Sequence, residues 1–134
     1  MAIMGKRFTA KLGDYTATIH MRPYEPRIDA GFWHGGSESP PKEVVHRCEV
    51  RYRGKVVPLG RGVYCDLAEV NRIYFYKNRR GEVVLTIEGG DADDGYNAYL
   101  VFSKGELVRR RVENGEFPKN FYEETRYIRI PYID

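Results

Sequence analysis

Four short apolar runs between residues 72 and 112, separated by three turn signals at nearly even spacing, are the feature that most constrains the fold. Each run is rich in β-branched or aromatic residues, a composition typical of strands. The runs span 73–76, 83–87, 96–102 and 107–112. The intervening segments, 78–81, 89–95 and 103–105, contain the glycine, asparagine, aspartate or serine residues that tight hairpins need. The pattern predicts a four-stranded antiparallel meander.

A hairpin is predicted near the start of the chain, because apolar and polar residues alternate on both sides of a two-residue turn. The alternation runs over 7–12, and it resumes over 15–22 after Gly13 and Asp14. A two-residue loop of this kind fits the twist of the flanking strands and fixes their register. We therefore expect the odd-numbered residues from 15 to 21 to face the core.

Residues 44–52 show the longest alternation in the chain, with the even-numbered residues on the more apolar face. This face includes His46 and Cys48, so we expect His46 to be a core histidine. The second of the two cysteines, Cys65, also falls in an apolar run. Because both cysteines fall in apolar positions of strand-like runs, we expect both thiols to be buried. We also expect them to be unpaired and reduced, because the first residues carry no apolar run typical of an export signal.

The remaining runs bring the total to about eight to ten short strands, which predicts an all-β fold. We expect a single antiparallel domain over 1–134, in the form of a sandwich or a partly open barrel. With 134 residues and 42% hydrophobic content, the chain is long enough to form one core without disulfides or metal. One short helix is predicted near 66–71, because Asp66 followed by Glu69 resembles a capping box. A final strand is predicted over 125–133.

The segment 22–43 is the predicted site of function, because it is long, broken by four prolines and without a sustained period. Loops of this length in compact domains are usually functional or disordered. It contains Trp33, the single tryptophan, which we expect to be partly buried, with His34 beside it forming one wall of a shallow site. The predicted binding residues are Tyr24, Phe32, Trp33 and His34 from this loop and Tyr99 from the meander.

The sequence does not contain a recognisable catalytic set, and we predict no catalytic residue. Both cysteines occupy apolar phases, where burial raises the pKa of a thiol and makes it a poor nucleophile. The glycines at 60 and 62 lack the third glycine and the Lys-Ser/Thr pair of a phosphate-binding loop. We expect no cofactor. If a general base exists, His34 is the histidine best placed for it, beside Trp33 and flanked by glycines.

Metal binding is not expected either. The acidic turn at 90–97 contains Asp91, Asp93 and Asp94, but a calcium loop needs its glycine after the third ligand and a closing glutamate, and both are missing. None of the three histidines has a second histidine or cysteine at the spacing of a zinc site. We predict a solvent-exposed turn without metal.

The leading functional hypothesis is a cytoplasmic, non-enzymatic module that binds a protein or a ligand through the 22–43 loop and the adjoining meander surface. The alternative is a small-molecule or carbohydrate-binding protein, or an unusual enzyme, with a pocket near Trp33 and His34. A third hypothesis is single-stranded nucleic-acid binding, but we do not expect it because the net charge of +3 is small and evenly interleaved. We expect no membrane partner. We expect a monomer, or a homodimer paired through an edge strand.

Overall fold

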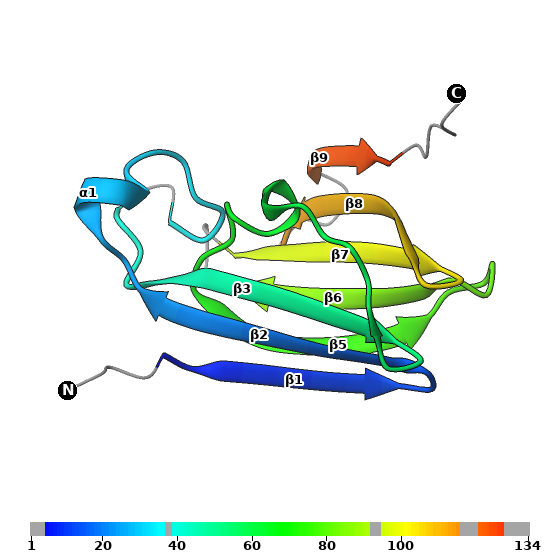
Figure 1. Ribbon diagram of the computed structural model, residues 1–134. Coiled ribbons are helices and arrows are strands. Elements are labelled where there is room, and N and C mark those ends of the chain that lie inside the picture. Colours follow the sequence, from blue (N-terminus) through cyan, green and yellow to red (C-terminus); the bar gives the residue numbers. More distant parts are fainter. Residues whose placement is uncertain (1–4, 37–38, 92–94, 116–120, 128–134) are drawn as a thin grey trace, which may run out of the picture.

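Two antiparallel sheets pack face to face in the computed structural model, which describes residues 5–36, 39–91, 95–115 and 121–127 (Figure 1). The four-stranded sheet has the order β1 (Arg7–Leu12), β2 (Tyr15–Pro23), β3 (Glu43–Tyr52) and β4 (Lys55–Val56). The five-stranded sheet has the order β5 (Val70–Lys77), β6 (Val83–Gly89), β7 (Tyr96–Ser103), β8 (Glu106–Asn114) and β9 (Phe121–Arg126). The predicted all-β antiparallel fold is confirmed, and of the two forms left open, a sandwich or a partly open barrel, the structure has the sandwich-like one.

The hairpin and the meander follow the predicted pattern. In the hairpin, Leu12 pairs with Tyr15 around Gly13 and Asp14, and Gly13 adopts the positive φ of 57° that the tight turn requires. The core-facing residues of β2 are Tyr15, Ala17, Ile19 and Met21, all buried. Each strand from β5 to β8 pairs with the next. The strand after the meander, β9, begins earlier than predicted, and residues 128–134 of the predicted strand lie outside the described part of the chain.

The core lies between the sheets, but the sheets differ in width. β1 lies beside β5 at one edge, so β2 and β3 cover the middle of the five-stranded sheet and leave β8 and β9 beyond them (Figure 1). A crossover segment, residues 57–69, passes from the first sheet to the second and lies over β8. The largest wholly buried side chains include Ile19, Leu67, Leu85, Tyr96, Leu100 and Phe102.

The prediction that His46 is a core histidine is wrong, because a β-bulge changes the phase of β3. His20 pairs with Arg47 and Met21 pairs with Val45, so His46 is the extra residue that the ladder skips. Val45 therefore faces the core and His46 is exposed to solvent. Val44 is buried on the other face of the strand, where Trp33 packs on it.

The helix predicted near 66–71 does not form there. The nearest helical turn is the 3-10 helix η1 (Arg61–Val63), whereas Leu67 and Ala68 make isolated bridges to His34 and Val44. The Glu69 carboxylate accepts hydrogen bonds from the backbone N–H groups of Lys42 and Glu43, each at 2.8 Å. The acidic side chain that resembled a helix cap thus caps the start of β3.

Among the described residues, α1 (Pro26–Asp29) and η1 are short, and neither is a candidate for crossing a membrane.

Thiol labelling should distinguish the two cysteines, which are unpaired as predicted. Cys48 is buried, and burial raises the pKa of its thiol to about 12, so it should react only after unfolding. Cys65 is exposed, contrary to the expectation of burial, because it lies in a turn directly after η1. We expect one fast-reacting thiol in native protein and two in denaturant, and Cys65→Ala should remove the fast one. Slow reaction of both thiols would contradict the exposed position of Cys65.

Candidate binding site

Trp33 is a buried anchor for the 22–43 loop, not the partly exposed wall that we predicted. Its indole N–H donates to the backbone oxygen of Asp29 at 2.6 Å, and its ring packs against Val44 and Ala68. Asp29 in turn holds Arg22 through two hydrogen bonds of 2.6 and 2.7 Å, and this bond to Arg22 lowers the pKa of Asp29. The loop is therefore tied to the end of β2 and to β3.

The predicted binding residues fall into two separate places. Tyr24 packs at the edge of the Trp33 cluster, and Phe32 contacts the His34 ring edge-on with the ring centres 5.0 Å apart. His34 itself is buried and packs near Tyr96. Tyr99 lies apart from these residues, on the outer face of β7, because its neighbours in the strand face the core. The structure thus brings four of the five together.

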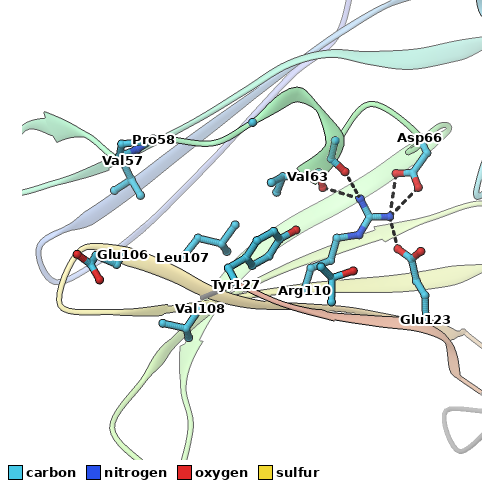
Figure 2. Close-up of a pocket in the computed structure, with 13 residues that line it drawn as sticks. Val57, Pro58, Val63, Asp66, Glu106, Leu107, Val108, Arg110, Glu123 and Tyr127 are labelled. Carbon is cyan, nitrogen blue, oxygen red and sulfur yellow. Dashed lines mark hydrogen bonds and ion pairs between the residues drawn. The ribbon is translucent and has the colours of Figure 1, made fainter. Parts of the chain in front are cut away.

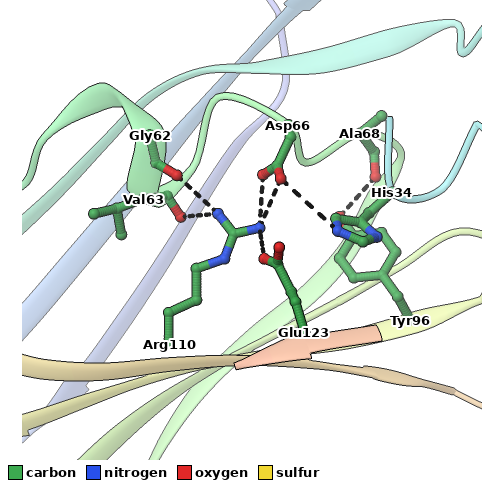
Figure 3. Close-up of polar contacts among 8 residues, drawn as sticks. All are labelled: His34, Gly62, Val63, Asp66, Ala68, Tyr96, Arg110 and Glu123. Atoms are coloured by element: carbon green, nitrogen blue, oxygen red, sulfur yellow. Dashed lines mark hydrogen bonds and ion pairs between the residues drawn. The ribbon is translucent and has the colours of Figure 1, made fainter. Parts of the chain in front are cut away.

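A buried arginine that sequence reasoning did not single out lies at the centre of the most polar region of the interior (Figure 3). Arg110 of β8 is 2% exposed, and its Nη1 donates to the backbone oxygens of Gly62 at 3.0 Å and Val63 at 2.8 Å. Its Nη2 donates to both carboxylate oxygens of Asp66 at 2.8 Å and forms an ion pair with Glu123 of β9. One guanidinium therefore joins β8, the crossover segment and β9.

The sequence carried a signal for this arginine. Arg110 is the middle residue of three consecutive arginines, and strand alternation places it on the face opposite Arg109 and Arg111. Val112, two residues away, is wholly buried. A charged residue in phase with a core valine in a predicted strand indicates a paired, buried charge.

The cluster around Arg110 carries more negative than positive charge. Burial opposes the charge on Arg110, but the hydrogen bond to Asp66 and the charges of Asp66 and Glu123 outweigh it and raise the arginine pKa. His34 Nε2 lies 3.8 Å from Asp66 Oδ2, and burial lowers the pKa of His34 so that the imidazole is neutral at pH 7. Two carboxylates then face one guanidinium.

A cavity of about 930 Å³ opens next to this cluster, between the crossover segment and the strands β8 and β9 (Figure 2). Asp66, Arg110 and Glu123 form its polar end. The apolar part of the lining includes Val57, Pro58, Val63, Leu107, Val108 and Tyr127. A volume of several hundred cubic ångströms with a mostly apolar lining and a few convergent polar groups is typical of small-molecule sites.

The same cluster also contains three groups that could ligate a metal. Single ligand atoms of His34, Asp66 and Glu123 all lie within 4.8 Å of one another. Arg110, however, already binds both carboxylates, so two of the three candidate ligand groups are engaged in ion pairs. The geometry therefore favours an ion-pair cluster over a metal centre. In the acidic turn, Asp93 and Asp94 lie outside the described residues, so the metal-free turn stays a prediction.

Replacing Arg110 by methionine should lower the free energy of unfolding by about 3 kcal/mol, because Asp66 and Glu123 would lose their shared cation. The lower end of the range for buried pairs applies, since the two carboxylate side chains are 31% and 38% exposed. Urea unfolding followed by circular dichroism measures the change. Arg109→Met is the matched control on the outer face of β8 and should change stability by less than about 1 kcal/mol. Equal losses in the two variants would contradict the central role of Arg110.

Stability should depend on pH through His34, which faces Asp66, Glu123 and Arg110. Burial lowers its pKa in the folded state below the ordinary 6.5, so the unfolded chain binds more protons between the two values. The contribution of His34 is complete above about pH 7.5 and decreases as the pH falls below 6.5, by at most about 1.4 kcal/mol per pH unit. Urea titrations from pH 5.5 to 7.5 should show a shallower pH dependence for His34→Gln than for wild type. A His20→Gln control that flattened the profile equally would contradict this assignment.

No protein-family model, no curated protein and no solved structure matches this chain. The inference of function therefore rests on the geometry of the cavity and of the cluster at its polar end.

Proposed function

We propose that this protein binds a small molecule in the cavity between the crossover segment and β8–β9. The carrying observation is the cavity itself, about 930 Å³ in volume, whose apolar lining ends in a fixed cluster of charged groups. The sequence-based hypothesis placed a pocket beside Trp33 and His34. The proposed site includes Asp66 in its lining but not His34, which contacts Asp66 from outside the cavity.

Preorganisation of the polar end supports binding. The guanidinium of Arg110 is held by two backbone oxygens and two carboxylates before any ligand arrives. A group that is already ordered costs little conformational entropy when a ligand packs against it. The cavity can therefore discriminate among ligands by charge and shape with a small ordering penalty.

Binding fits the lining better than catalysis does. Among the described residues that line the cavity, the hydroxyl groups belong to Thr125 and Tyr127, and the lining contains neither a histidine nor a cysteine. A hydroxyl nucleophile needs a base within hydrogen-bond reach, and His34 lies behind Asp66 rather than in the lining. We therefore propose a binding protein rather than an enzyme. Its two free thiols are consistent with the cytoplasmic location predicted from the sequence.

Protein binding through the 22–43 loop is a second candidate function, supported by two exposed apolar side chains. Ile28 is 72% exposed and Phe32 is 64% exposed, although the loop that carries them is anchored by Trp33. Exposed apolar residues on an ordered loop are suited to contact with a partner. Nucleic-acid binding lacks comparable support, because Arg109 and Arg111 on the outer face of β8 form ion pairs with Glu124 and Glu113.

A neutral, environment-sensitive dye such as Nile red tests the proposed cavity. We expect saturable fluorescence enhancement with one dye bound per chain, because the dye would leave water for the apolar lining. Thr125→Trp adds an indole to the cavity lining and should weaken binding at least about tenfold, which corresponds to about 1.4 kcal/mol. Arg126→Trp is the matched control. Arg126 lies on the face of β9 opposite Thr125, and its register partner in β8 is Arg109. Unchanged dye binding by Thr125→Trp would show that the dye binds elsewhere and contradict the proposal.

A further inference from the structure

We infer that the ligand of the cavity is an organic cation, an amine with an apolar body, whose positive charge pairs with Glu123 and Asp66. This inference rests on the proposed function and names the ligand class. Three observations carry it: the hydrogen bonds that occupy Arg110, the charge balance at the polar end, and the position of the two carboxylates at the cavity.

Arg110 has no donor left for an anionic ligand. A guanidinium offers five N–H donors, two on each Nη and one on Nε. Nη1 bonds to Gly62 and Val63, and Nη2 bonds to Asp66 and pairs with Glu123. The remaining donor, Nε, lacks a partner but is buried out of reach of solvent. A carboxylate or phosphate group that entered the cavity would therefore meet carboxylates and no free arginine donor.

Among the described residues, the polar end carries one positive charge fewer than negative charges. Asp66 and Glu123 together contribute two negative charges, and Arg110 is the cation within ion-pair distance of both among the described residues. His34, the other basic group in contact with Asp66, is held neutral by burial. One monovalent cation would balance the cluster around Arg110.

Both carboxylates are accessible from the cavity. The side chains of Asp66 and Glu123 are 31% and 38% exposed, whereas that of Arg110 is 2% exposed. A ligand thus reaches acceptor oxygens at the polar end of the cavity. Leu107 and Val57 lie further along the cavity, away from the two carboxylates (Figure 2). This order of groups matches a molecule with an ammonium head and an apolar body. It does not match a bare metal ion, which would leave the apolar lining unused.

Three probes that share one alkyl chain test the ligand class: octylammonium, 1-octanol and octanoate, titrated into the full chain at pH 7.5 by calorimetry. We expect octylammonium to bind at least about tenfold more tightly than octanol, and octanoate to bind most weakly, because a charge-assisted pair forms with the first probe alone. Glu123→Gln should remove the preference for octylammonium and leave octanol binding within about twofold of wild type. Glu124→Gln removes the same charge from the outer face of β9 and should keep the preference. Melting curves of both variants verify that they are folded.

The outcomes separate the ligand class from the cavity itself. If octanol or octanoate binds as tightly as octylammonium, and Thr125→Trp still blocks binding, the cation inference is overturned and the proposed binding site stands. If Glu123→Gln and Glu124→Gln weaken octylammonium binding equally, the preference reflects the net charge of the protein, which also overturns the inference. If Nile red and all three probes fail to bind, both the proposed function and the cation inference are overturned. Should Glu123→Gln fail to fold, the order of the three probes on wild-type protein still decides.

Discussion

The buried guanidinium of Arg110 attaches the crossover segment to the part of the five-stranded sheet that β2 and β3 leave uncovered. The crossover segment is not a strand, so it cannot be attached to the five-stranded sheet by a ladder of backbone hydrogen bonds. Arg110 replaces that ladder: it binds the backbone oxygens of Gly62 and Val63 and the side chain of Asp66, and it pairs with Glu123 of the last described strand. Because one side chain of β8 binds groups of the crossover segment and of β9, a single residue joins the three segments that line the cavity.

The cavity itself is a consequence of joining a narrow sheet to a wide one. Face-to-face packing fills the space between β2, β3 and the strands from β5 to β7 with interlocking apolar side chains. Beyond β3 the first sheet continues as the two-residue strand β4, and an irregular segment covers the neighbouring part of the second sheet (Figure 1). The core that stabilises the fold and the cavity proposed to bind a ligand are thus neighbouring parts of one interior. Changes in the cavity lining can alter binding without removing the packing that keeps the protein folded.

Sequence patterns predicted local pairings well and long-range polar contacts poorly. The hairpin around Gly13 and the meander rest on alternation and turn residues, which lie close together in the chain. The phase error at His46 arose because a bulge depends on how β2 and β3 pair, not on β3 alone. Glu69 resembled part of a helix cap, yet its carboxylate accepts hydrogen bonds from the backbone N–H groups of Lys42 and Glu43, which lie 27 and 26 residues earlier in the chain. Arg110 donates hydrogen bonds to Asp66, which lies 44 residues earlier in the chain. At such a separation, residue spacing does not predict which side chains meet.

The two irregular segments of this protein are joined by their backbones, not merely placed side by side. The backbone N–H of His34 donates to the oxygen of Asp66, and the oxygen of His34 accepts from the N–H of Ala68, both at 2.9 Å. The loop that presents Ile28 and Phe32 is therefore hydrogen-bonded to the residue that forms the polar end of the cavity. Thermodynamic reciprocity requires that, if a partner bound to this loop changes the affinity for a ligand at Asp66, the ligand changes the affinity for the partner by the same factor.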